Sequence, residues 1–146
     1  VRVMKIQLLG SYQNNKDALK LPMMLHAVQA GFPSPADDYF SEVLDINELF
    51  ENDPTSSYYA RVSGDSMIDV GIYQGDVLSV NRGLEPKNND IIIVAVDNEF
   101  TCKFFKKNHD SIDLIPGNKN FPIMSYSGLE EVEFWGVVTG VARKLR

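Results

Sequence analysis

Short runs of β-branched and aromatic residues, separated by Gly, Pro, Asn and Asp, follow one another from residue 58 onward. Such runs are typical of strands, and the turn-forming residues between them favour hairpins. Asp97-Asn98, which separates two of the runs, predicts a tight hairpin turn. We expect strands over residues 58–62, 77–80, 91–96, 99–105, 111–115 and 132–141. The pattern restricts the fold to a mainly β domain of antiparallel strands with short helices.

The first part of the chain, residues 1–33, lacks a clean hydrophobic period, and we interpret it as a partly ordered arm. After it, Ser34-Pro35-Ala36-Asp37 combines a capping side chain, a first-turn proline and an early acid. This combination predicts a short helix that ends near Val43. Asp45 is placed to cap another short turn over residues 46–50.

Length and composition fit one domain with an arm. A chain of 146 residues, 44% of them apolar, can bury a core, and we divide it into an arm, residues 1–33, and a β-rich domain, residues 34–146. The net charge of −6 disfavours a DNA-binding surface and favours protein partners. The single cysteine, Cys102, allows no internal disulfide, which fits the cytoplasm. The longest apolar run, residues 91–96, is far too short to cross a membrane.

The stretch Val62-Ser63-Gly64-Asp65-Ser66-Met67 presents a serine directly after a Gly-Asp turn. A serine hydroxyl becomes a nucleophile when a neighbouring base accepts its proton. The two histidines are poorly placed for that role, because His26 lies in the arm and His109 lies in a polar loop. A Ser-His-Asp triad would need one of them delivered to Ser66 by the fold.

Lys103 is the other candidate base. In the expected strand 99–105 its side chain shares a face with Thr101 and Phe105, so the amine has an apolar neighbour. Burial disfavours a charged amine and lowers its pKa, and a neutral lysine can take a hydroxyl proton. A Ser-Lys dyad is therefore chemically possible. The ordinary alternatives are a solvated lysine on an edge strand and a serine that only forms a turn.

Other reactive side chains favour structural roles. Cys102 shares a strand face with Phe100 and Phe104, so we expect a small core residue and not a nucleophile. No cluster of His, Cys or Asp has the spacing of metal ligands, and we expect neither a metal nor a cofactor.

Several segments resemble, in order and spacing, the self-cleaving peptidase domain of the LexA/UmuD family. The resemblance covers about residues 28–146 and rests on Ser63–Met67, Gly75–Leu78, Asn89–Val94 and Glu99–Lys103. It implies a compact, mostly antiparallel β domain with a mobile N-terminal arm. It also implies that Ser66 is the nucleophile and Lys103 the general base. The Ala30–Gly31 bond, within Ala30-Gly31-Phe32-Pro33, resembles the bond that the family cleaves.

Physical properties of this segment agree with the implied roles. Ala30 is small and Gly31 has no side chain, so the peptide can enter a narrow cleft. The backbone N–H groups of Ser66 and Met67, in the turn 65–67, are candidate donors to an oxyanion. The linker from Ala30 to Ser66 reaches on the order of 100 Å when extended, so its length does not decide between cleavage within and between chains.

The short arm resembles the UmuD branch of the family. LexA repressors carry a helix-turn-helix domain before the cleavage segment. Such a domain needs about 60 residues or more, whereas about 30 residues precede Gly31 in this sequence. The UmuD branch implies an accessory subunit that is processed in the SOS response and joins the UmuC subunit of an error-prone DNA polymerase. It also implies stimulation by the RecA filament on single-stranded DNA, homodimerisation, a cytoplasmic location, and no sequence-specific DNA binding. The apolar segment 134–141 could serve the dimer interface or the core.

Other classes stay open at this point. One is a fragment of a LexA-like repressor, and another is a non-catalytic binding module of the same fold. A type I signal peptidase also uses a Ser-Lys dyad, yet it needs a membrane anchor that we do not expect here.

Overall fold

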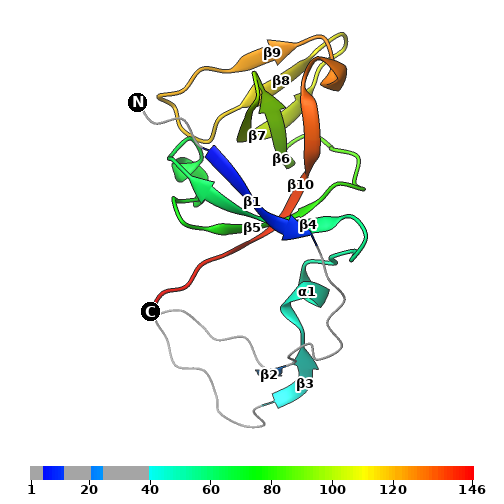
Figure 1. Ribbon diagram of the computed structural model, residues 1–146, viewed down its shortest axis with the longest axis vertical. Coiled ribbons are helices and arrows are strands. Elements are labelled where there is room, and N and C mark those ends of the chain that lie inside the picture. The colour runs from blue at the N-terminus through cyan, green and yellow to red at the C-terminus, as the bar shows by residue number, and fades with distance from the viewer. Residues whose placement is uncertain (1–4, 12–20, 25–39) are drawn as a thin grey trace. The chain divides into compact units, whose positions relative to one another are not determined.

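The computed structural model of the chain describes residues 5–11, 21–24 and 40–146, and its elements are shown in Figure 1. The strands are β1 (Lys5–Ser11), β2 (Leu21–Met24), β3 (Phe40–Leu44), β4 (Ser57–Ser63), β5 (Val77–Asn81), β6 (Ile91–Val96), β7 (Glu99–Lys107), β8 (Ile112–Ile115), β9 (Met124–Tyr126) and β10 (Glu133–Ala142). The helices are short: α1 (Ile46–Leu49), η1 (Ile68–Val70) and η2 (Leu129–Glu131). The predicted mainly β class is confirmed. No helix in these described ranges is long and apolar enough to cross a membrane.

Two compact units divide the chain: residues 1–13 together with 52–146, and residues 14–51. The larger unit holds an eight-stranded antiparallel sheet in the order β1-β4-β5-β10-β6-β7-β8-β9. The hairpin between β6 and β7 turns at Asp97 and Asn98, with φ of 51° and 64°, as the sequence predicts for a two-residue turn. This hairpin sets the register that pairs Lys103 with Ile92.

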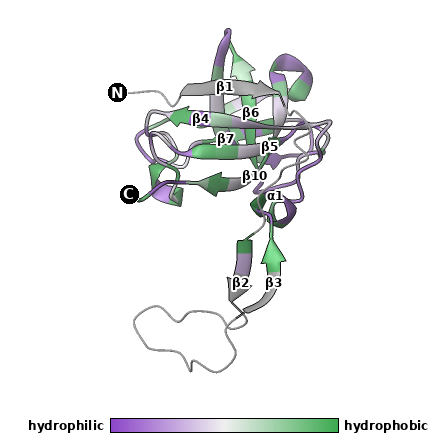
Figure 2. Ribbon diagram, turned by 60° about the horizontal axis from the view of Figure 1, so that its bottom comes forward, coloured by the Kyte–Doolittle hydropathy of each residue, from purple (hydrophilic) through white to green (hydrophobic). Residues whose placement is uncertain are grey.

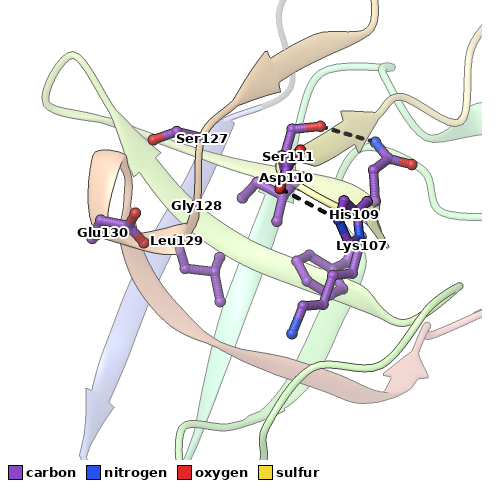
Figure 3. A pocket seen from close by; sticks show the side chains of 11 residues that line it. Lys107, His109, Asp110, Ser111, Ser127, Gly128, Leu129 and Glu130 are labelled. Atoms are coloured by element: carbon purple, nitrogen blue, oxygen red, sulfur yellow. Dashed lines mark hydrogen bonds and ion pairs between the residues drawn. The ribbon is translucent and has the colours of Figure 1, made fainter.

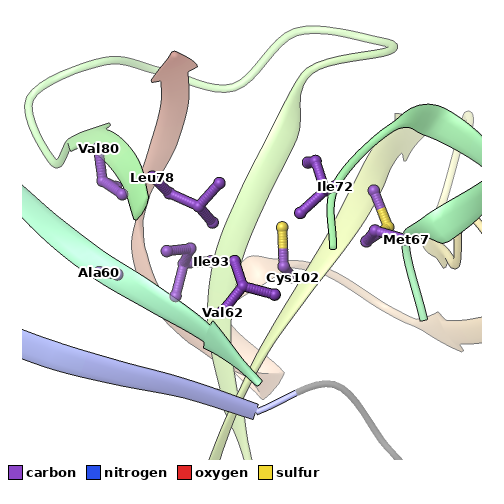
Figure 4. Close-up of a cluster of buried hydrophobic side chains, with 8 residues drawn as sticks. All are labelled: Ala60, Val62, Met67, Ile72, Leu78, Val80, Ile93 and Cys102. Atoms are coloured by element: carbon purple, nitrogen blue, oxygen red, sulfur yellow. The ribbon is translucent and has the colours of Figure 1, made fainter. Parts of the chain in front are cut away.

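Two hydrophobic clusters fill the larger unit, and β6 and β7 contribute to both. The first cluster, drawn in Figure 4, contains the fully buried Cys102 together with Ala60, Val62, Met67, Ile72, Leu78, Val80 and Ile93. The predicted core role of Cys102 is therefore confirmed. Phe105 belongs to the second cluster, so Cys102 and Phe105 lie on opposite sides of β7.

Part of the predicted arm has regular structure. Lys5–Ser11 forms β1, which pairs with β4 from Lys5 opposite Ser63 to Ser11 opposite Tyr58. The sequence signal was weak because Gly10 and Ser11 interrupt a short apolar run. The available edge of β4 supplies the hydrogen-bond partners that this segment lacks by itself. The division at residues 33 and 34 stays a prediction.

In the smaller unit, β2 and β3 form an antiparallel pair, and α1 follows β3 (Figure 2). The helix predicted from residue 34 to Val43 is wrong over its described end, since Phe40–Leu44 is a strand. Pairing with Leu21–Met24 outweighs the capping signal there, and residues 34–39 lie outside the described ranges. The short turn predicted after Asp45 is present as the one-turn helix α1. Its cap is Asp45, whose Oδ1 accepts a hydrogen bond from Asn47 N at 2.9 Å.

Candidate active site

Ser66 lies in a turn between β4 and η1. Gly64, with a φ of 99°, lets the chain leave β4, and Gly71, with a φ of 84°, ends η1. Both values lie in the left-handed region that glycine adopts without strain. The Ser66 side chain is fully buried under this turn, and so is the neighbouring Met67. A serine that serves only as a surface turn residue would be exposed.

Lys103 reaches the same place from β7. Its Nζ donates a hydrogen bond to Ser66 Oγ at 3.3 Å, although 37 residues separate the two in sequence. The lysine is only 5% exposed. The structure thus brings together the two side chains that sequence reasoning singled out as nucleophile and base.

The surroundings of the Lys103 amine favour its neutral form. Burial lowers the pKa of Lys103 below its usual value, and the nearby Cys102 opposes this shift only partly. Burial also raises the pKa of Cys102 to about 12, so its thiol stays uncharged near neutral pH. The Phe121 ring centroid lies 6.0 Å from the amine. In the described part of the chain no ion pair joins Lys103 to a carboxylate.

The Ser66 turn also carries the candidate oxyanion donors. Over the described residues, the backbone N–H groups of Ser66 and Met67 donate to no protein acceptor. The Asp65 carboxylate has a buried oxygen, Oδ1, that is likewise without a hydrogen-bond partner there. Unpaired polar atoms beside a buried hydroxyl are typical of a site that receives a further group.

A segment that sequence reasoning missed braces this turn. Asn118 Nδ2 donates to the Asp65 carbonyl at 2.9 Å, and Gly117 O accepts from Asp69 N at 2.8 Å. Gly117 lies so close that a Cβ there would sit 3.1 Å from Met67 Cα. Pro116-Gly117-Asn118 is recognisable in the sequence as a turn, yet nothing local indicates that its partner lies about 50 residues earlier.

His109 lies elsewhere and does not contact Ser66. Its side chain is 97% exposed and its Nε2 is 3.8 Å from Asp110 Oδ1. It lines an open pocket of about 320 Å³, shown in Figure 3, between the β7–β8 turn and the segment that includes η2. Ser66 is not among the lining residues, which are Phe105, Lys107, Asn108, His109, Asp110, Ser111, Ile112, Ser127, Gly128, Leu129 and Glu130. The other histidine, His26, and the expected cleavage site, Ala30 and Gly31, lie outside the described residues.

Comparisons with known proteins agree on one family. Residues 22–139 match the family described as Peptidase S24-like. The chain is 41% identical to Protein MucA of Salmonella typhimurium over 120 residues, which is 82% of each chain. It is 38% identical to Protein SamA of the same species over 125 residues, 86% of each chain. It is also 34% identical to the LexA repressor of Xylella fastidiosa over 132 residues, 90% of this chain and 62% of the repressor.

Proposed function

We propose that this chain, which belongs to the Peptidase S24-like family of LexA and UmuD, cleaves its own N-terminal arm as a serine peptidase. Family membership confirms the resemblance drawn from the sequence motifs. The observation that carries the proposal is the 3.3 Å hydrogen bond between the buried Lys103 Nζ and Ser66 Oγ. A buried lysine without a carboxylate partner is poised to accept a proton, and a buried serine beside it can donate one.

The first half of the reaction is acylation. Neutral Lys103 takes the proton of Ser66 Oγ while that oxygen attacks the carbonyl carbon of Ala30. The resulting oxyanion accepts hydrogen bonds from the backbone N–H groups of Ser66 and Met67. As the bond to Gly31 breaks, the lysine ammonium returns its proton to the leaving amine. An ester then joins Ala30 to Ser66.

The second half is hydrolysis of that ester. Lys103, neutral again, removes a proton from a water molecule, which attacks the ester carbonyl. The Ser66 oxygen leaves and regains its proton from the lysine. The products are a peptide that ends at Ala30 and a chain that begins at Gly31. The lowered pKa of Lys103 favours both halves, because each needs the amine without its proton.

The small residues at the expected cleavage site fit this chemistry. A methyl group at Ala30 and no side chain at Gly31 keep the scissile carbonyl accessible to a buried hydroxyl. A charged side chain at residue 30 would have to lose its water in the site. Ala30→Asp should therefore block cleavage while Ser66 and Lys103 stay in place.

The biological role that we propose follows the UmuD branch. The processed chain acts in SOS mutagenesis as a cytoplasmic homodimer and as the accessory subunit of a UmuC-type translesion DNA polymerase. The RecA filament on single-stranded DNA stimulates cleavage by binding better to the arm conformation that places the scissile bond at Ser66. The similarity to MucA and SamA over most of their lengths supports this branch. The alternatives are a LexA-like repressor fragment and a non-catalytic binding module.

A single-cut assay tests the proposal. The purified chain is incubated at about pH 10, and separately near neutral pH with RecA filament, and mass spectrometry identifies the fragments. Wild type should yield a fragment that begins at Gly31, and Ser66→Ala should yield none while its stability changes by about 1 kcal/mol or less. Ser63→Ala is the matched control, because Ser63 is an exposed serine of the same motif. An intact wild-type chain under every condition would favour the binding module.

A further inference from the structure

We infer that Asn118 is a positioning residue for this reaction, because it sets the direction of the Ser66 backbone N–H toward the oxyanion. The inference deepens the proposed function and rests on it. Asn118 lies on the segment 116–121, part of the connection between β8 and β9, and this segment crosses the Ser66 turn. Neither its residue type nor its position in the sequence points to a catalytic function.

Both ends of the Asn118 side chain are engaged. Its Nδ2 donates to the Asp65 carbonyl oxygen at 2.9 Å, and its Oδ1 accepts from the backbone N–H of Asn120 at 3.0 Å. The carbonyl oxygen only accepts and the backbone N–H only donates, so the two contacts together define which way the amide faces. The side chain is nearly excluded from solvent, at 5% exposure. Water therefore competes poorly for either bond.

The contact with Asp65 acts on Ser66 through the peptide group that they share. The Asp65 carbonyl and the Ser66 N–H belong to one planar unit, and the chain has no cis peptide bonds in its described part. In a trans peptide these two groups point in opposite directions. Holding the carbonyl toward Asn118 therefore holds the Ser66 N–H away from it. That N–H is free of protein acceptors among the described residues.

The same carbonyl accepts a second hydrogen bond, from Ile68 N at 3.3 Å. Two donors at one carbonyl polarise the peptide group and make its N–H a stronger donor. The turn thus supplies one of these bonds locally, and the segment 116–121 supplies the shorter one across 53 residues. Among the described residues, loss of Asn118 would leave the longer bond as the one hydrogen bond to this carbonyl.

The rest of the segment holds Asn118 at a fixed height over the turn. Gly117 N lies 3.0 Å from Met67 Sδ, and Gly117 O accepts from Asp69 N at 2.8 Å. Lys119 N donates to Asp69 Oδ2 at 3.2 Å. These contacts flank Asn118 on both sides in sequence. The amide is consequently a rigid support for the Asp65 carbonyl and not a loop residue that happens to touch it.

The test is single-turnover self-cleavage of the full chain from about pH 6 to 10, with Asn118→Asp and Asn118→Ala beside wild type. Asn118→Asp keeps the shape but replaces the donor with an oxygen that repels the Asp65 carbonyl. Asn120→Asp is the matched control, since it makes the same charge change at an exposed position of the same segment. Thermal unfolding of each variant sets a common temperature at which all of them are folded.

We expect the plateau rate at high pH to fall about 10- to 100-fold in Asn118→Asp and less in Asn118→Ala, because removal of one oxyanion donor costs about 100- to 1,000-fold. In Asn118→Ala the pH at which the rate levels off should not move, because neither Lys103 nor the charge around it changes. Asn120→Asp should cleave like wild type. A folded Asn118→Asp protein that cleaves within twofold of wild type, or a folded Asn118→Ala protein whose profile shifts along the pH axis, would overturn the inference alone. Absence of cleavage in wild type would overturn the proposed function with it.

Discussion

Asp76 and Lys103 are charged residues that are both buried in the larger unit, and their surroundings differ. Asp76 is 1% exposed and Lys103 is 5% exposed. Asp76 faces a cation, whereas Lys103 faces a hydroxyl and an aromatic ring. The Asp76 carboxylate stays charged and stabilises the fold through its ion pair, whereas the Lys103 amine can lose its proton.

Asp76 is held as an anion by Arg143, the residue that follows β10 by one position. The guanidinium donates from Nε to Oδ1 and from Nη2 to Oδ2, both at 2.6 Å. Arg143 Nη2 also donates to Gly71 O at 3.0 Å. Mainly through these side-chain hydrogen bonds, Arg143 holds the pKa of Asp76 below its usual value. The pair ties the C-terminal segment to the stretch that follows η1.

Lys103 has no such partner in the described part of the chain, and its pKa moves for the opposite reason. Burial without compensation lowers its pKa, which makes the neutral amine available. Burial alone therefore does not make a base. An anion beside Lys103 would keep its proton in place, as Arg143 keeps Asp76 ionised.

The largest expected effect is on activity at Lys103. Lys103→Arg keeps the positive charge but cannot supply a neutral base, so self-cleavage should fall by at least about 100-fold at every pH from 6 to 10. Wild-type cleavage should rise with pH and level off at the pKa of Lys103, below 10.5. Single-turnover assays measure both. His109→Ala is the control and should cleave like wild type. An active Lys103→Arg variant would remove Lys103 from the mechanism.

The next effect is on stability at the paired charge. Arg143→Ala leaves the Asp76 carboxylate buried without its cation, which should lower the free energy of unfolding by about 2 kcal/mol at pH 7. The loss is below that of a fully buried pair because the Arg143 side chain is 40% exposed. Urea denaturation in a Ser66→Ala background measures it without interference from cleavage.

Arg61→Ala is the control for this measurement. Arg61 is exposed and donates to Gly75 O at 3.2 Å, so it also contacts the stretch after η1. It makes no hydrogen bond or ion pair with the Asp76 side chain. Its loss should cost about 0.5 kcal/mol or less, and an equal loss in both variants would contradict the special role of the buried pair.

The smallest expected effect is on stability at Lys103, and it should depend on pH. Lys103→Met should raise the free energy of unfolding by about 1 kcal/mol at pH 7, because it removes an uncompensated buried amine. The folded pKa of Lys103 is below that of the unfolded chain, so stability rises with pH between the two values and the advantage of methionine vanishes near 10.5. At Asp76 stability also rises with pH, but in the acid range and because a favourable pair forms: its contribution is complete above its unfolded pKa, near 3.8, and is lost as pH falls through the folded value. Urea midpoints across pH measure both, and a methionine advantage that grows with pH would contradict this account.

Local patterns predicted most of the strands. The runs that became β4, β5, β6, β7, β8 and β10 are recognisable because each carries its own alternation and its own turn signals. The same holds for the Asp45 cap and the Asp97-Asn98 hairpin. The strands that were missed are β1, β2, β3 and β9, whose strand state depends on a partner elsewhere in the chain. Strand formation of this kind is a property of the pair and not of the segment.

The candidate site divides in the same way. Residue type and strand alternation are local, so the sequence identifies the residues that carry reactive groups: Ser66 after a Gly-Asp turn and Lys103 on an apolar strand face. Three contacts could be seen only in the folded chain: Lys103 meets Ser66 at 3.3 Å, Asn118 reaches Asp65 across 53 residues, and Arg143 reaches Asp76 across 67. Contacts at such separations follow from sheet order and strand register, which depend on the whole chain at once. Whether Lys103 is a solvated charge or a base is therefore a property of what packs around it.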